Sequence, residues 1–133
     1  MGLNDLGLPG FTSYPEPGTP PTAARLTAGL TTLADRLHAA GLTVIGSTIG
    51  PYQGTVHDGY DSEAGQAVRR EVNAWLLGDN HPFDAVTDVA AAVADPARPD
   101  RIRDEYNAGD GLHVNDAGAK AIADAVDVSL LDL

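Results

Sequence analysis

Leucines recur every three or four positions between residues 22 and 41. The stripe consists of Leu26, Leu30, Leu33 and Leu37. Spacings of four, three and four place these side chains on one face of an α-helix. Thr22 has the hydroxyl of a helix N-cap, and Gly41 supplies a typical stop. The pattern therefore predicts an amphipathic helix between these two residues.

The apolar pattern then changes from helical to extended and back again. Residues 42–49 form a short β-rich run closed by Gly50 and Pro51, which is typical of a strand buried on both faces. A helix is predicted from about Ser62 to Leu77. Trp75 lies on its apolar face, which favours packing in the core over binding a ligand. Residues 83–89 indicate a second strand, although the alanines that follow would also suit a helical turn.

The remaining segments are predicted to be loops, except for the last. Prolines and glycines interrupt residues 6–21 so often that we expect a surface excursion without regular structure. Residues 52–60 and the polar segment 95–110 are also expected to be loops. A last helix should begin near Asn115 and Asp116. Helices that alternate with buried strands predict an α/β fold with a parallel sheet, built as a single unit over residues 1–133.

Composition narrows the possible partners. With 8 basic and 19 acidic residues the chain has a formal charge of −11 and lacks a basic cluster, so nucleic acid is an unsuitable partner. No apolar run approaches the ~20 residues of a membrane span, and the first residues do not have the pattern of a signal peptide. The absence of cysteine excludes disulfides and thiolate metal sites. The sequence does not indicate where in or outside the cell the protein is located.

Asp110 and His113 form the most informative pair of residues. A carboxylate three positions before a histidine, in a turn that contains Gly111, can accept the imidazole Nδ1 proton and leave Nε2 free as a general base. This is the orienting half of a serine hydrolase triad. The spacing is common, however, and a capping aspartate beside a surface histidine is its more frequent interpretation.

The surroundings of this pair resemble a known family. The segment from Gly109 to Gly118, GDGLHVNDAG, is similar to the last conserved block of the SGNH/GDSL hydrolases, with Val114 in place of the usual proline. Residues 2–5, GLND, match the GxND block of that family. Further similar segments follow in the family order: residues 46–52, 71–76, 84–88 and 94–96. Together they cover nearly the whole chain.

This resemblance implies a fold and a chemistry. The fold would be part of a three-layer α/β/α, flavodoxin-like SGNH hydrolase domain with a parallel sheet, whose N-terminal strands are absent. The activity would be carboxylic ester hydrolysis, with His113 as general base, Asp110 as its orienting partner and the Asn4 amide as an oxyanion donor. The free nitrogen of His113 should then point toward Asn4. Substrates would be small-molecule, carbohydrate or lipid esters.

The nucleophile of this family is not in the chain. Its serine belongs to a Gly-Asp-Ser block that precedes GxND, and here GxND begins at residue 2. The serines present are Ser13, Ser47, Ser62 and Ser129, none of them in that context. Ser47 alone lies on a predicted strand, where hydroxyls usually bond locally. We therefore expect no nucleophile in this chain, and we expect the missing N-terminal half or a second chain as a partner.

Two other functions stay open. The chain could be a non-catalytic SGNH-like remnant or a truncated gene product, or it could be a ligand-binding module of other origin. We expect no cofactor and no metal, because His38, His57 and His81 are interpreted as surface histidines and the acidic residues near position 60 lack calcium-loop spacing. A partial sheet would also expose apolar faces, which predicts marginal stability or aggregation.

Overall fold

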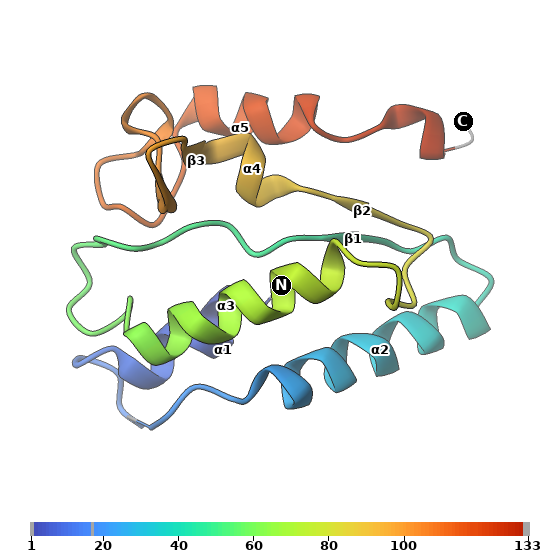
Figure 1. The fold of residues 1–133 in the computed structure, drawn as a ribbon, viewed down its shortest axis with the longest axis horizontal. Coiled ribbons are helices and arrows are strands. Elements are labelled where there is room, and N and C mark those ends of the chain that lie inside the picture. Colours follow the sequence, from blue (N-terminus) through green and yellow to red (C-terminus); the bar gives the residue numbers. More distant parts are fainter. Residues whose placement is uncertain (1, 17, 132–133) are drawn as a thin grey trace.

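A computed structural model describes residues 2–16 and 18–131. Five α-helices, four strands and three 3-10 helices follow one another along these residues (Figure 1). Their order and bounds are α1 (Leu3–Gly7), η1 (Leu8–Gly10), α2 (Ala23–Ala39), β1 (Ile45–Ser47), α3 (Glu63–Leu76), β2 (Ala85–Thr87), α4 (Val89–Val93), β3 (Ala94–Asp95), β4 (Arg98–Ile102), η2 (Asp104–Tyr106), α5 (Asp116–Asp124) and η3 (Val128–Leu131).

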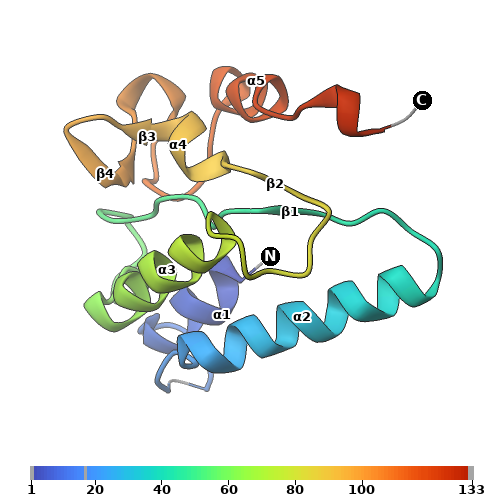
Figure 2. The same cartoon turned by 45° about the vertical axis from the view of Figure 1, so that its right-hand side comes forward.

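The helices cover both faces of a small parallel sheet. Strands β1 and β2 pair in parallel, with Gly46 opposite Val86. In Figures 1 and 2, α1, α2 and α3 lie on one side of these strands, and α4 and α5 lie on the other. The buried cluster centres on Leu6, Ile49, Tyr52 and Val72, and Trp75 packs against it. The α/β class and the parallel pairing predicted from the sequence are confirmed.

Local capping accounts for the helix starts. The side chains of Thr22, Ser62 and Asn115 each accept a hydrogen bond from a backbone amide three residues later, at the starts of α2, α3 and α5. Each cap satisfies one of the amides that a helix start otherwise leaves unpaired. The predicted helix starts agree with the structure for this reason.

The prediction of a structureless surface loop over residues 6–21 is wrong at its start. Helix α1 includes Leu6, which is fully buried, and η1 continues to Gly10. Pro9 lies in the first turn of η1, where a missing backbone N–H costs nothing. Regular structure therefore extends to Gly10, further into the proline-rich segment than we predicted.

The segment between residues 95 and 110 contains a hairpin that the sequence did not reveal. β3 and β4 pair antiparallel, with Asp95 opposite Arg98. Pro96 lies in the connecting turn, where the Asp95 carboxylate accepts a hydrogen bond from the Ala97 amide. Pro99 is tolerated within β4 because every strand of a two-stranded sheet has a free edge.

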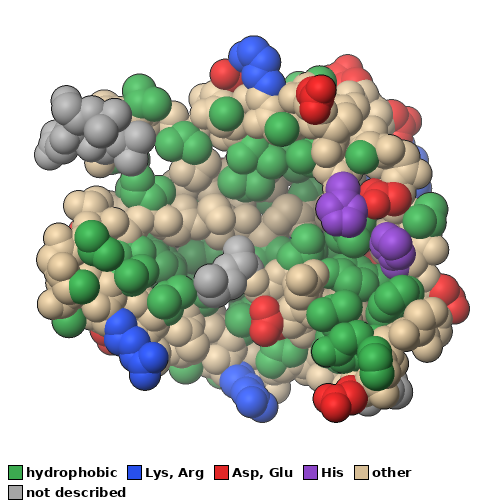
Figure 3. All heavy atoms as spheres, turned by 180° about the vertical axis from the view of Figure 1, so that it is seen from behind, with side chains coloured by type: hydrophobic (Ala, Val, Ile, Leu, Met, Phe, Trp, Pro, Cys, Tyr) green, Lys and Arg blue, Asp and Glu red, His purple; other side chains and the backbone are tan. Residues whose placement is uncertain are grey.

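The parallel strands are shorter than predicted, and β1 has a free edge. The expected strands 42–49 and 83–89 reduce to three residues each, and the alanine run forms α4, the alternative left open above. Among the described residues, β1 pairs only with β2. Figure 3 shows a furrow across one face of the molecule, with hydrophobic side chains along its walls. Both strands are shorter than predicted because each pairs with only one neighbour among the described residues.

Candidate active site

The carboxylate of Asp110 holds the His113 ring. Its Oδ2 lies 2.6 Å from His113 Nδ1, and its Oδ1 accepts hydrogen bonds from the backbone amides of Leu112 and His113 at 2.9 and 2.8 Å. The bond to the His113 ring, followed by the bond from the His113 amide, holds the pKa of Asp110 well below its usual range. Asp110 is therefore an ionised acceptor that selects the Nδ1-protonated imidazole.

The other ring nitrogen of His113 is accessible. The side chain is 69% exposed, and among the described residues Nε2 forms no hydrogen bond. The ring also borders a cavity of about 260 Å³ on the α4 and α5 side of the sheet. Its wall is otherwise apolar and consists of Leu3, Gly50, Pro51, Val89, Val93, Ile102, Leu112, Val114 and Ile122. Nε2 can therefore exchange a proton with a group from solvent or from a partner.

The turn that carries this pair is fixed from both of its ends. Asn107 Oδ1 accepts hydrogen bonds from the amides of Gly109 and Gly111 at 2.8 and 3.0 Å. Asn115, the N-cap of α5, donates from its amide to the Asn107 carbonyl at 3.2 Å. These bonds place the Asp110 turn directly before a helix start, as the sequence predicted.

The loop after β1 packs against the same turn. The Asp110 carbonyl accepts hydrogen bonds from the Val56 amide and the Thr55 hydroxyl, both at 2.9 Å. Gly111 has φ +71°, and a Cβ on it would lie 2.7 Å from the Gly54 carbonyl oxygen. Only glycine fits both this backbone conformation and this close approach.

Asn4 is linked to Asp110 through the side chains of Tyr60 and His57. Its Oδ1 accepts a hydrogen bond from the Tyr60 hydroxyl at 2.7 Å, and among the described residues its Nδ2 forms none. The Tyr60 ring lies 6.3 Å from the His57 ring, and His57 Nε2 lies 3.9 Å from Asp110 Oδ2. Asn4 and His113 are thus connected through Tyr60, His57 and Asp110, and among the described residues no hydrogen bond joins them directly.

Neither His57 nor Tyr60 was assigned to the site from the sequence. We interpreted His57 as a surface histidine, yet it packs edge-on against Phe11 and faces Asp110. Figure 3 shows two histidine side chains close together beside an acidic one at one end of the furrow. The only available signal was the position of His57 in the loop that follows the first predicted strand.

None of the four serines borders the His113 cavity. Ser62 caps α3, and the Ser129 hydroxyl bonds to Asp127 at 2.6 Å. Ser47 is exposed at the end of β1 and borders a different cavity, on the α2 side of the sheet. Ser13 is exposed in the loop after η1. No serine of the described residues is thus within reach of His113 through this cavity.

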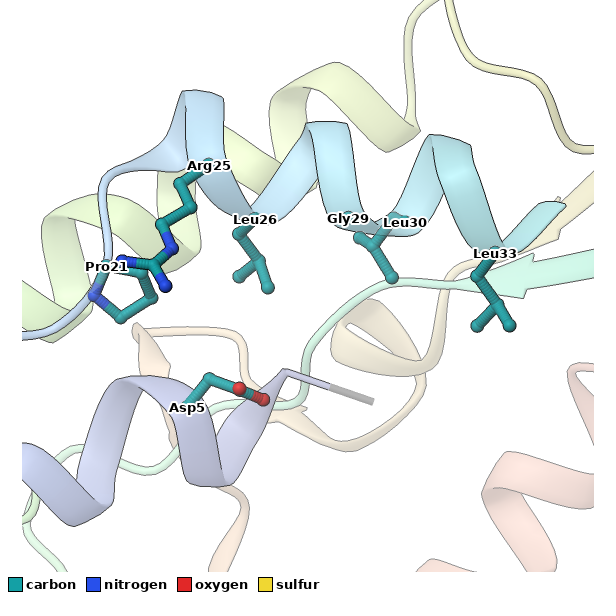
Figure 4. A pocket seen from close by; sticks show the side chains of 7 residues that line it. All are labelled: Asp5, Pro21, Arg25, Leu26, Gly29, Leu30 and Leu33. Atoms are coloured by element: carbon teal, nitrogen blue, oxygen red, sulfur yellow. The ribbon is translucent and has the colours of Figure 1, made fainter. Parts of the chain in front are cut away.

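A further cavity, of about 260 Å³, lies between α1 and α2. Figure 4 shows the side chains of Leu26, Leu30 and Leu33 pointing from α2 toward it, with Asp5 on the facing helix and Arg25 at one end. The leucine stripe that predicted α2 is therefore only partly covered.

Over residues 2–16 and 18–131, no three His, Cys, Asp or Glu side chains gather in the manner of metal ligands. Within the same ranges, no helix combines the length and the apolar character that crossing a bilayer requires.

Comparison with known proteins identifies the family. No protein with a curated description matches the chain. The model of the GDSL-like Lipase/Acylhydrolase family matches residues 1–121, which is most of the chain. Together with the α/β fold, this match confirms the family resemblance found in the sequence. The chain belongs to the GDSL-like lipase/acylhydrolase family.

Proposed function

We propose that this chain provides the histidine and oxyanion side of a carboxylic ester hydrolase that works through an acyl-serine intermediate. One observation carries this proposal: Asp110 Oδ2 lies 2.6 Å from His113 Nδ1, while Nε2 stays accessible. In a serine hydrolase the acidic residue fixes the imidazole tautomer and stabilises the imidazolium. The lowered pKa of Asp110 supports that role.

The reaction follows from these roles. His113 Nε2 takes the proton of a serine hydroxyl as the oxygen attacks the ester carbonyl, and then returns it to the departing alcohol. Water repeats the attack on the acyl-serine and releases the acid. The Asn4 Nδ2 group would donate a hydrogen bond to the oxyanion, which typically contributes about 3 kcal/mol to transition-state stabilisation.

The nucleophile would come from polypeptide that occupies the free edge of β1. A strand added in parallel to β1 runs in the same direction, so its carboxyl end lies near Gly50 and Pro51. Those two residues border the His113 cavity. A serine in the loop after such a strand would therefore approach His113, with residues 1–133 and the added strands forming one domain.

The substrate would be a small-molecule, carbohydrate or lipid ester. The formal charge of −11 disfavours a polyanionic substrate. The apolar lining of the His113 cavity suits an uncharged acyl or alcohol group.

A non-catalytic scaffold is the second candidate. It is favoured by one observation, namely that no serine among the described residues borders the cavity of His113. In that case the chain keeps the family fold and could retain a binding surface.

Hydrolysis of short-chain p-nitrophenyl esters separates the two candidates. The assay compares the chain alone with a polypeptide extended by any in-frame upstream coding sequence that contains a Gly-Asp-Ser segment. We expect turnover from the form that carries this serine, loss of turnover with His113→Ala, and unchanged turnover with the control His38→Ala, which lies at the other end of the sheet. Absence of turnover from both forms would support the scaffold instead.

A further inference from the structure

The Asp110 carboxylate has one acceptor position to spare. An ionised carboxylate offers about four lone-pair sites. Three are used by the amides of Leu112 and His113 and by His113 Nδ1. His57 Nε2 faces the same oxygen, Oδ2, at 3.9 Å, which is within ion-pair range but too long for a hydrogen bond. Two imidazole rings thus face one carboxylate oxygen, and only that of His113 is hydrogen-bonded to it.

The position of His57 is fixed by its surroundings. Its ring packs edge-on against Phe11 with centroids 5.7 Å apart and lies 6.3 Å from the Tyr60 ring. Its backbone amide donates to the Thr55 hydroxyl at 3.4 Å, and that hydroxyl donates to the Asp110 carbonyl. The side chain is 37% exposed, so it can exchange protons with solvent.

We propose that His57 is a positioning residue that acts on His113 through Asp110. When His57 takes up a proton, its positive charge lies beside the same Oδ2 that stabilises the protonated His113, and the two positive rings repel each other. A positive charge at position 57 therefore disfavours the protonated form of the His113 ring. The relevance for turnover rests on the proposed function, whereas the coupling itself does not.

The other polar and charged groups around His57 have partners of their own, which substitution of His57 does not remove. Asp58 accepts a hydrogen bond from the Thr12 hydroxyl at 3.3 Å, and Asp61 accepts one from the Gly54 amide at 2.6 Å. The phenol of Tyr60 is bound to Asn4. From β4, the Arg101 guanidinium lies against Gly54. Variants of His57 leave these groups in place, so a changed titration of His113 reports His57 alone.

Titration of the His113 ring resonances by NMR tests this coupling. The variants His57→Gln and His57→Phe remove the titrating ring, and the second keeps its apolar packing. His57→Lys supplies a lasting positive charge. We expect the midpoint of the His113 titration to rise in the order Lys variant, wild type, Gln variant, with about half a pH unit or more between the two variants.

A control and a folding check complete the experiment. His38→Gln removes a histidine at the opposite end of the sheet and should leave the His113 curve unchanged. Far-UV circular dichroism identifies any variant that does not fold, and His57→Phe then replaces His57→Gln. Coinciding curves for the neutral and the Lys variants would overturn the coupling, as would midpoints displaced in the same direction. Because no ester is turned over, this result is independent of whether the proposed function holds.

Discussion

The side-chain amide of Asn73 satisfies both backbone groups of Ile49. Its Oδ1 accepts from the Ile49 amide at 2.7 Å, and its Nδ2 donates to the Ile49 carbonyl at 2.8 Å. Both residues are buried. Asn73 thereby attaches α3 to the chain that leaves β1, two residues before Pro51 enters the wall of the His113 cavity.

Replacement of Asn73 by alanine should destabilise the protein strongly. Two buried backbone groups would lose a partner, at about 1 to 3 kcal/mol for each. The Arg69 guanidinium, 3.4 Å from the Ile49 carbonyl, would compensate in part. We expect a loss of about 2 to 4 kcal/mol in urea unfolding. Glu71→Ala on the exposed face of the same helix is the control and should change stability by less than about 0.5 kcal/mol.

Asp110→Asn should release the His113 ring while the fold stays intact. The neutral amide does not stabilise an imidazolium as the carboxylate does, so the downfield proton signal of Nδ1 should disappear from the NMR spectrum. Where turnover is present, it should fall by about four orders of magnitude. Asp116→Asn, in the exposed first turn of α5, should leave the signal in place. A persistent Nδ1 signal in Asp110→Asn would contradict the pairing seen here.

Asp84 should make stability depend on acidic pH. Its Oδ2 lies 2.7 Å from the Val44 amide and 2.9 Å from His38 Nε2. The hydrogen bond from the Val44 amide, followed by that with His38, lowers the pKa of Asp84. Because the unfolded value is about 4, the stabilisation is complete above that pH and is lost as pH falls through the lower folded pKa.

The variant Asp84→Asn removes this dependence. The difference in unfolding free energy between wild type and variant should be constant above about pH 4 and shrink as the pH falls below that value. Urea titrations across this range measure it, with Asp79→Asn in the turn after α3 as the control. A difference that is constant with pH would mean that the carboxylate charge is unimportant.

Gly111→Ala should disturb the turn that carries Asp110 and His113. The added Cβ would lie 2.7 Å from the Gly54 carbonyl oxygen, at a backbone angle of φ +71°. We expect a loss of about 1 to 3 kcal/mol, together with altered amide shifts at Asp110 and Val56. Gly29→Ala on α2 meets nothing within 4 Å and should raise stability by about 0.5 to 1 kcal/mol. Equal effects of the two variants would argue against a tight turn.

Features that depend on neighbouring residues were predictable from the sequence. The caps Thr22, Ser62 and Asn115 each act three residues along the chain, and so does the carboxylate of Asp110 on His113. The alternation of these helices with apolar runs was enough to predict a parallel sheet. The resemblance to the family blocks added proposed roles for Asn4, Asp110 and His113, which spacing alone left open.

Features that depend on distant contacts were not predictable. The hairpin of β3 and β4 forms in spite of Pro96 and Pro99, because a turn and a free edge tolerate them. His57 meets Asp110 only because the loop after β1 packs on a turn far along the chain. The limits of β1 follow from pairing with a single neighbour, which no local pattern encodes.

The bond between Tyr60 and Asn4 has a consequence for the oxyanion role proposed for Asn4. Burial, and next the nearby charge of Asp5, raise the pKa of the Tyr60 phenol, so its proton is retained throughout the neutral and mildly alkaline range. A phenol that always donates holds Oδ1 and prevents the Asn4 amide from flipping. The two N–H bonds of Nδ2 consequently keep their direction, so a hydrogen bond from Asn4 to an oxyanion, as proposed above, would require no rearrangement of this amide.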